Sequence, residues 1–291
     1  MTAAGKSLQG KTILVTGANA GIGKETAVAL AAMGARVAMV ARDEAKGRAA
    51  EADVRARSKS DAVELYLADF ASFASTRAFA AKFLAEHDRL DVLVNNAGLL
   101  LPSRSVTADG FESMFGINHL GYFLTTHLLL PLLKKSGPSR IVVVASHAHR
   151  GQKLDFDDLQ GERSFSPFGA YGRSKLCNIY FTYELAERLA GTGVTANCLH
   201  PGVVATDFGK KKPGFINVLL RLGAPFLMNA EKGAATQIHL AASPDVEGVT
   251  GKYFDKSVPV DSSKESRDVA ARKRLWETSE KLTGITRYGE P

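Results

Sequence analysis

Short runs of branched apolar residues alternate with longer stretches of helical spacing along most of the chain. Continuous or alternating apolar runs predict strands, and apolar residues three and four positions apart predict amphipathic helices. The strands predicted in this way are residues 12–16, 36–40, 63–67, 91–95, 140–144, 195–199 and 252–254. The predicted helices are residues 22–33, 43–57, 72–86, 107–133, 170–190, 230–241 and 264–282.

This alternation is typical of a parallel sheet whose strands are joined by crossover helices. The run from Ile141 to Val144 is apolar and branched throughout, as expected for a strand covered on both faces. The chain contains no linker, internal repeat or low-complexity segment. We therefore predict one domain over residues 1–291, a doubly wound α/β fold with a seven-stranded, mostly parallel sheet and helices on both faces.

The composition is that of a globular protein. Of the 291 residues 45% are hydrophobic and 23% are charged, which excludes disordered, collagen-like and disulfide-scaffold classes. The formal net charge is +7, but most basic residues are interspersed with acids, as in residues 42–51. Because no basic stripe interleaved with aromatic residues accompanies this charge, we predict no nucleic-acid partner. An anionic ligand or a membrane surface stays open as a partner.

The cysteines, histidines and apolar runs exclude several other classes. Cys177 and Cys198 lie in apolar segments and are expected to be buried thiols of a reducing compartment. No run of about 20 apolar residues predicts a transmembrane helix, and residues 1–10 do not resemble a secretion signal. We therefore predict a cytoplasmic protein. Metal ligation is not expected, because no cluster of ligand residues is evident. Three histidines look catalytic in isolation. His147 and His149 are interpreted as pocket-rim or structural residues, and His200, which precedes Pro201, is interpreted as shaping the exit of the strand.

The first predicted strand runs directly into a glycine-rich turn and a helix, with the sequence TGANAGIG at residues 16–23. Gly17 permits the tight turn, Gly21 lets the backbone approach a pyrophosphate, and Gly23 lets the helix pack closely on the strand. The start of the helix adds free N–H groups and the positive end of its dipole. In this context the turn predicts binding of a dinucleotide by a Rossmann fold.

The spacing of this turn, Thr-Gly-x-x-x-Gly-x-Gly, resembles the short-chain dehydrogenase/reductase family. Further blocks follow in the order of that family over nearly the whole chain. These blocks are Asn95-Asn96-Ala97-Gly98, Asn118, Ser146, Tyr171 with Lys175, Pro201-Gly202, and Thr206. Within the family, the segments NHLGYFL at 118–124, FGAYGRSK at 168–175 and HPGVV at 200–204 are most similar to the retinol-dehydrogenase-like branch.

The residue at the tip of the second strand bears on the choice of nucleotide. An acid there would accept the ribose hydroxyls of NAD(H) and repel a 2′-phosphate. In this chain Ala41 is followed by Arg42, whose guanidinium can clamp a phosphate with two hydrogen bonds. We therefore predict NADP(H). The alternative is that Arg42 is a surface residue at a helix start, paired with Asp43.

Tyr171 and Lys175 are four residues apart in a predicted helix, so they project from the same face. A phenol has an ordinary pKa of about 10. A neighbouring ammonium and the positive charge of an oxidised nicotinamide are expected to lower the pKa of Tyr171. Tyr171 would then act as general acid in carbonyl reduction or general base in alcohol oxidation. Ser146 would hydrogen-bond the substrate oxygen.

The resemblance implies further roles. Lys175 would hold the nicotinamide ribose, and Asn118 would anchor a water that connects this lysine to solvent. Asp69 would contact the adenine amine, although it can equally be the N-cap of the following helix. The helices bearing Asn118 and Tyr171 would form a homodimer or homotetramer. The predicted catalytic residues are Asn118, Ser146, Tyr171 and Lys175, and the predicted cofactor-binding residues are Gly17, Asn19, Gly21, Ile22, Gly23, Arg42, Asp69, Asn95, Ala97, Gly98, Tyr171, Lys175, Pro201 and Thr206.

The apolar stretch 215–228 is interrupted by polar residues, glycine and proline, so we expect it to cover a surface rather than span a bilayer. Residues 207–229 are predicted to form a substrate lid that, with Phe165, Phe168 and Ser146, encloses an apolar alcohol, aldehyde or ketone. The alternative is that these side chains form a subunit interface or plain core.

Together these features predict an NADP(H)-dependent oxidoreductase that interconverts an alcohol and a carbonyl, on a small and lipophilic substrate. A different class, a non-catalytic dinucleotide sensor or regulatory subunit on the same fold, is the alternative. The complete set of Asn118, Ser146, Tyr171 and Lys175 argues against a sensor, which has no need of all four.

Overall fold

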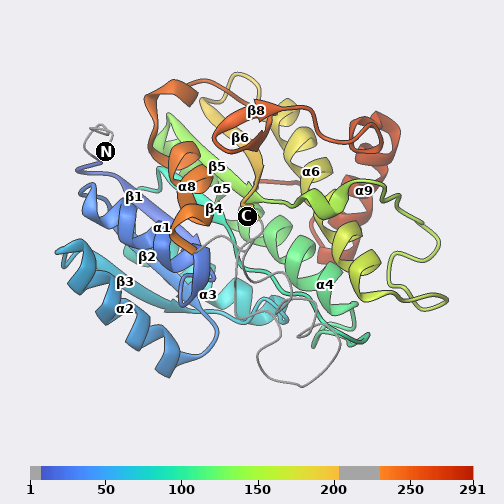
Figure 1. The fold of residues 1–291 in the computed structure, drawn as a ribbon, viewed down its shortest axis with the longest axis horizontal. Coiled ribbons are helices and arrows are strands. Elements are labelled where there is room, and N and C mark those ends of the chain that lie inside the picture. Colours follow the sequence, from blue (N-terminus) through green and yellow to red (C-terminus); the bar gives the residue numbers. More distant parts are fainter. Residues whose placement is uncertain (1–7, 203–229, 291) are drawn as a thin grey trace.

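A single eight-stranded sheet forms the centre of the molecule in the computed structural model, which describes residues 8–202 and 230–290 (Figure 1). The strands lie in the order β3-β2-β1-β4-β5-β6-β7-β8; all neighbours are parallel except β7 and β8. Their bounds are β1 (Thr12–Thr16), β2 (Arg36–Ala41), β3 (Val63–Leu67), β4 (Val92–Asn95), β5 (Ser139–Val144), β6 (Val194–His200), β7 (Tyr253–Asp255) and β8 (Val258–Val260).

The predicted doubly wound α/β fold is confirmed, but the sheet has one strand more than the seven predicted. The additional strand β8 lies at the edge and pairs antiparallel with β7, Tyr253 opposite Val260. It is three residues long, exposed at every position, and contains Pro259. Proline has no N–H to donate and is normally confined to edge strands. The strand was missed because so short a segment shows no alternation of apolar and polar residues.

Helices cover both faces of the sheet, as predicted (Figure 1). The side chains of β1 point alternately to the two faces of the sheet. Ile13 and Val15 pack in one cluster with α1, α2 and α8, and Leu14 packs in the other with α3, α5 and α6. The bounds are α1 (Gly21–Ala32), α2 (Glu44–Ser58), α3 (Phe73–Glu86), α4 (Ser113–Phe115), η1 (Gly116–Leu120), α5 (Gly121–Ser136), η2 (His147–His149), α6 (Pro167–Arg188), α8 (Ala230–Ala242), η4 (Pro244–Val246), η5 (Glu265–Arg267) and α9 (Val269–Thr283).

Two predicted helices are wrong in part. The helix predicted over 107–133 begins only at Ser113, and its first residues form a turn in which Gly110 has φ +84° and its N–H donates to Thr107 O at 3.0 Å. The helix predicted over 264–282 is divided into η5 and α9. The division falls at Asp268, whose carboxylate accepts from the N–H of Ala271 and caps α9.

The C-terminal helix α9 and the residues after it pack against α5 and α6. Trp276 stacks on Phe181 with ring centres 6.0 Å apart and meets Phe123 edge-on at 5.0 Å. The guanidinium of Arg272 pairs with the carboxylate of buried Glu184 at 2.9 Å. The C-terminal segment therefore covers part of the two helices through which the resemblance implies subunit pairing; the oligomeric state stays a prediction.

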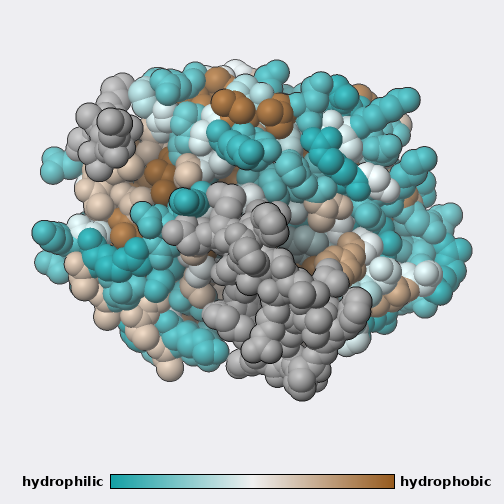
Figure 2. Space-filling model, in the orientation of Figure 1, coloured by the Kyte–Doolittle hydropathy of each residue, from teal (hydrophilic) through white to brown (hydrophobic). Residues whose placement is uncertain are grey.

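The surface is predominantly polar in the view of Figure 2, with apolar residues gathered over the sheet edge at β8. Val258 and Val260 of this strand are 54% and 38% exposed. Within the described parts of the chain, no helix has the length and apolar character needed to cross a bilayer.

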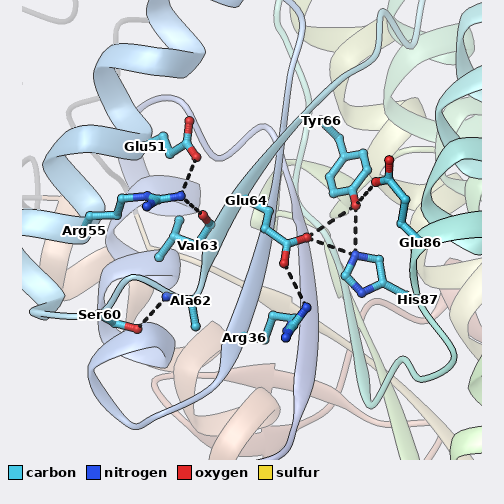
Figure 3. A network of polar contacts seen from close by, with 10 residues as sticks. All are labelled: Arg36, Glu51, Arg55, Ser60, Ala62, Val63, Glu64, Tyr66, Glu86 and His87. Carbon is cyan, nitrogen blue, oxygen red and sulfur yellow. Dashed lines mark hydrogen bonds and ion pairs between the residues drawn. The ribbon is translucent and has the colours of Figure 1, made fainter.

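A polar cluster fixes β3 against the end of α3 (Figure 3). The hydroxyl of Tyr66 lies 2.6 Å from a carboxylate oxygen of Glu86 and 2.8 Å from Nε2 of His87. Glu64 bridges His87, at 3.1 Å, and the exposed Arg36, at 3.2 Å. Burial and the adjacent carboxylates raise the pKa of Tyr66, so its phenol stays protonated and can donate to Glu86.

Replacing Tyr66 by Phe is expected to lower the free energy of unfolding by about 1–3 kcal/mol, because it leaves Glu86 and His87 without their shared partner. Arg36→Met is the matched control, because it removes an exposed ion pair of the same cluster and should cost less than about 1 kcal/mol. Urea unfolding of both variants measures the difference. Equal losses in the two variants would contradict the role given to Tyr66.

Candidate active site

Four turns of the predicted site meet at one edge of the sheet. β1, β4, β5 and β6 are successive neighbours, and all four run parallel. Their carboxyl ends therefore carry the glycine turn, the Asn96 loop, Ser146 and Pro201 to the same edge. The order of strands reverses between β1 and β4, and in doubly wound sheets ligands bind outside the carboxyl ends at this point.

The glycine turn has the close backbone approaches that the sequence predicts. Gly17 has φ +65°, and a Cβ at this position would lie 2.8 Å from Cα of Ala97. A Cβ on Gly23 would lie 2.5 Å from O of Gly17, so only glycine lets α1 start against the turn. Gly21 has φ +55° at the first position of α1.

The start of α1 is available to an anion. Its N-cap, Ala20, provides no side-chain hydrogen bond. By contrast α2, α3, α6 and α9 are capped by Asp43, Ser72, Ser166 and Asp268. The first N–H groups of a helix need such acceptors, and a phosphate supplies them together with a charge that the helix dipole favours. The residues present therefore fit the pyrophosphate of a dinucleotide.

Thr16 and Asn96 tie the glycine turn to the end of β4. The hydroxyl of Thr16 accepts from the N–H groups of Asn96 at 2.8 Å and Ala97 at 2.9 Å. The amide of Asn96 donates to O of Thr16 at 2.8 Å and accepts from Gln237 of α8 at 3.2 Å. These three side chains were not among the predicted site residues. The TG and NN pairs of the sequence carried a signal for two of them, but nothing local marked Gln237.

Arg42 follows β2 directly beside the glycine turn, since the N–H of Ala18 donates to O of Val40 at 3.1 Å. Its side chain is exposed. Asp43, the partner in the alternative interpretation, caps α2 through the N–H of Lys46 at 2.9 Å. Among the described residues no ion pair involves the Arg42 guanidinium. This group is therefore available to pair with the 2′-phosphate of a bound nucleotide.

Two predicted cofactor-binding residues, Asp69 and Asn95, make hydrogen bonds within the protein. Asp69 accepts from the N–H of Ala71 at 3.0 Å, and the cap of α3 is Ser72, so the interpretation of Asp69 as helix cap is wrong. Asn95 is fully buried, and its amide donates to the hydroxyl of Thr126 at 2.9 Å. Its side chain therefore secures β4 on α5.

Lys175 is a buried cation whose partner is neutral. Its Nζ donates to O of Val144 at 3.0 Å and lies 5.7 Å and 5.6 Å from the ring centres of Tyr122 and Tyr171. Burial lowers the pKa of this amine to about 7. A Cβ on Gly98 would lie 3.5 Å from Nζ, so the glycine keeps the approach to the amine clear. This arrangement fits the ribose hydroxyls that the resemblance assigns to Lys175.

Asn118 lies in η1, a single π-helical turn between α4 and α5. Such turns widen a helix locally and are frequent at functional sites. The amide of Asn118 donates to O of Leu99 at 2.9 Å and to the hydroxyl of Ser174 at 3.0 Å, and its carbonyl accepts from the N–H of Leu99 at 2.8 Å. The side chain thus joins the Asn96 loop to α6, beside Lys175.

Tyr171 and Ser146 are brought together, as predicted. The hydroxyl of Ser146 caps η2 by accepting from the N–H of Ala148 at 3.2 Å. Burial raises the pKa of Tyr171 to about 12, and a hydrogen bond with Ser146 opposes the rise. The lowering that we expected from Lys175 is not present in the protein alone, because burial is the largest influence on the pKa of both groups.

The remaining predicted residues lie near this edge or outside the described part of the chain. Pro201 follows β6, and Phe168 is 57% exposed on the first turn of α6. Phe165 lies just before this helix and is half-buried. Thr206 and the predicted lid 207–229 lie outside the described residues.

The three histidines beside Ser146 are arranged as structural residues. His147 stacks on His200 with ring centres 3.8 Å apart, and its N–H donates to Nδ1 of His200 at 3.3 Å. His149 is completely buried. Within the described residues no group of histidine, cysteine or acidic side chains could hold a metal ion.

A phosphate-binding turn at the reversal of strand order, with a tyrosine, a serine and a buried lysine beside it, defines an oxidoreductase that uses a nicotinamide dinucleotide. The chain belongs to the short-chain dehydrogenase family, whose model matches residues 11–214. It is 46% identical to retinol dehydrogenase 12 of Mus musculus over 278 residues, 96% of this chain and 88% of that protein. Over 294 residues it is 44% identical to retinol dehydrogenase 14 of Homo sapiens, again 96% of this chain and 88% of the relative.

Solved structures show the same fold. An uncharacterized protein from Mycobacterium paratuberculosis is 33% identical, with a TM-score of 0.78 over 97% of this chain and 96% of that one. The complex of Pseudomonas aeruginosa RhlG with NADP is 29% identical, with a TM-score of 0.68 over 85% of this chain and 95% of that one.

Replacing Lys175 by Met should change how stability depends on pH. Because the pKa of Lys175 is about 7 in the fold and about 10.4 in an unfolded chain, folding disfavours the charged amine. This cost is fully present below pH 7 and disappears as the pH rises toward about 10. Without cofactor, wild-type protein should therefore gain stability relative to Lys175→Met between pH 6 and pH 9.

Urea unfolding at the two pH values measures this difference. Lys135→Met, at an exposed position of α5, is the control and should show no such trend. A stability difference between wild type and Lys175→Met that does not change with pH would contradict the buried-amine interpretation.

Proposed function

We propose that this protein is an NADP(H)-dependent oxidoreductase that reduces the carbonyl group of a lipophilic aldehyde or ketone and, in the opposite direction, oxidises the alcohol. The position of Tyr171 next to Ser146 and to the buried Lys175, whose Nζ lies 5.6 Å from the Tyr171 ring centre, is the observation that carries this proposal. The family and the glycine turn support the use of a nicotinamide dinucleotide.

The protonation state of Tyr171 suits a donor of the proton to a carbonyl oxygen. With a pKa of about 12 the phenol is protonated at neutral pH, which is the form that a general acid requires. Ser146 is placed to donate a hydrogen bond to the same substrate oxygen and so to stabilise the charge that develops there. Tyr171 then transfers its proton to that oxygen. Bound NADPH supplies the hydride to the carbonyl carbon.

Lys175 would hold the nicotinamide ribose and stabilise the phenolate that Tyr171 becomes after the transfer. Its Nζ is within 5.6 Å of the Tyr171 ring centre, and its one described hydrogen bond, to O of Val144, uses only one of the three protons of an ammonium. Asn118 supports this arrangement through Ser174, the residue before Lys175.

The preference for NADP(H) rests on Arg42. Among the described residues its exposed guanidinium forms no ion pair, although, after the hydrogen bond from the N–H of Lys46, its charge is one of the causes that lower the pKa of Asp43. Arg42 follows the strand next to the glycine turn. A related structure, from Burkholderia cenocepacia, is a short chain dehydrogenase in complex with NADP and is 26% identical to this chain.

The proposed substrate class rests on the relatives. Those most similar to this chain include retinol dehydrogenases 12 and 14, and retinol is a lipophilic alcohol. Phe168 is exposed on the first turn of α6, the helix that carries Tyr171. Its ring supplies apolar surface for contact with such a substrate. The cytoplasmic location is likewise a proposal.

Replacing Tyr171 by Phe is expected to lower kcat by about 10²–10⁴-fold while leaving the dissociation constant of NADPH nearly unchanged, because only the transferred proton is removed. Turnover is measured over a panel of aldehydes, ketones and alcohols of increasing chain length. Full activity of the variant would rule out Tyr171 as the proton donor, and wild-type binding of NADPH without turnover of any member would favour the dinucleotide sensor.

Replacing Arg42 by Ala should raise the KM for NADPH by about tenfold or more, because a charge-assisted hydrogen bond to the 2′-phosphate is lost. The KM for NADH should not change. Arg48→Ala is the matched control, because Arg48 lies on α2 and already pairs with Glu44 and Glu51. Equal effects on both cofactors would contradict the proposed NADP(H) preference.

A further inference from the structure

A buried histidine, His149, contacts the main chain of Ser146. Nδ1 of His149 lies 2.6 Å from the main-chain O of Ser146, which also accepts from the N–H of His149 at 3.2 Å. On the other side of the ring, Nε2 of His149 accepts from the N–H of Ser263 at 3.0 Å. The edge of the ring faces Tyr253, with ring centres 5.2 Å apart.

These partners fix the proton on the ring. A main-chain N–H can only donate, so Nε2 carries no proton and accepts from Ser263. The neutral imidazole therefore carries its proton on Nδ1 and donates it to O of Ser146. Each ring nitrogen has one partner of the required kind, and His149 is completely buried between them.

The segment that contains Ser263 is anchored to the helix of Tyr171. The hydroxyl of Ser262 lies 2.7 Å from that of Tyr183, and the hydroxyl of Tyr180 donates to O of Glu265 at 2.8 Å. Tyr180 and Tyr183 belong to α6, which also carries Tyr171. Hydrogen bonds through His149 thus connect Ser146 to the C-terminal segment, which in turn is hydrogen-bonded to the helix that bears Tyr171.

A second contact brings the same turn close to α6. A Cβ on Gly172, the residue after Tyr171, would lie 2.5 Å from O of Ala148. The η2 turn therefore rests on the helix backbone at one point and is held by His149 at another. Because Ser146 is the N-cap of η2, the separation of the Ser146 and Tyr171 hydroxyls depends on the position of this turn relative to α6.

We propose that His149 is the positioning residue of the site: by donating from Nδ1 to the Ser146 carbonyl and accepting from Ser263, it holds the Ser146 turn at the distance from Tyr171 that carbonyl polarisation requires. This inference rests on the proposed function of Ser146 and Tyr171. His149 itself touches neither substrate nor cofactor in this role.

Two amide replacements separate the two ends of the ring. In His149→Asn the amide can lie near the position of Nδ1 and keep a donor to O of Ser146. In His149→Gln it lies near the position of Nε2, where it accepts from Ser263 and leaves the Ser146 carbonyl without its donor. We expect kcat to fall by about tenfold or more in the Gln variant, and by less in the Asn variant.

His127 provides a matched control. It is also a buried histidine that accepts a main-chain N–H of the C-terminal segment, from Gly289 to Nδ1 at 2.9 Å, but it lies on α5 against Tyr288. His127→Gln should lower the melting temperature as His149→Gln does, while kcat stays within about twofold of wild type. The dissociation constant of NADPH should be unchanged in all of these variants.

A double-mutant cycle tests whether His149 acts through Ser146. In a Ser146→Ala background, His149→Gln should cause no further loss of kcat, since the group that it positions is already absent. The proposal is overturned if His149→Gln and His149→Asn lower kcat equally, if His127→Gln lowers it as much, or if the loss persists in the Ser146→Ala background. Wild-type protein that turns over no carbonyl or alcohol would instead contradict the proposed function.

Discussion

The burial of a lysine amine beside a tyrosine is the constraint on which this site depends. Water would keep the amine of Lys175 charged, but the fold surrounds it with α5, α6 and the end of β5, and its pKa falls to about 7. Such a group is costly to bury, and the cost is acceptable only where a bound molecule later supplies hydrogen-bond partners. The same burial raises the pKa of Tyr171 to about 12 and keeps its proton in place. One desolvated environment thus lowers the pKa of Lys175 and raises the pKa of Tyr171.

The geometry of the sheet brings the parts of this site together. Because β1, β4, β5 and β6 are adjacent and parallel, residues far apart in the sequence, from Gly17 to Pro201, lie at one edge. The N-terminus of α1, which has no side-chain cap, lies at that edge and has N–H groups without a capping acceptor. The glycine at a positive φ and the missing helix cap are local features of the sequence. They come together as one site because the strand order reverses between β1 and β4.

Much of the fold and of the site could be predicted because its signals are local. The strands of the core are continuous apolar runs, and the glycine turn and the Tyr171 and Lys175 pair have fixed spacings. The failures have physical causes. β8 is too short and contains Pro259. The π-helical turn at Asn118 is five residues long, too short to show a period of its own. The pKa of Tyr171 depends on burial, which no spacing encodes. Gln237 and Ser263 were missed because their partners lie far away in the sequence.

The segment after β7 completes the site without carrying any of the predicted catalytic groups. Trp276 packs on Phe181 and Phe123, and Arg272 pairs with Glu184. The N–H of Ser263 donates to the ring of His149. This segment therefore contacts both α6 and the turn of Ser146. A helix that bears a buried lysine on one face needs firm support on the other, because any loosening would admit water and restore the charge of the amine. The aromatic and ionic contacts of α9 provide that support. Residues about 100 positions further along the chain thus pack against the helix that carries Lys175.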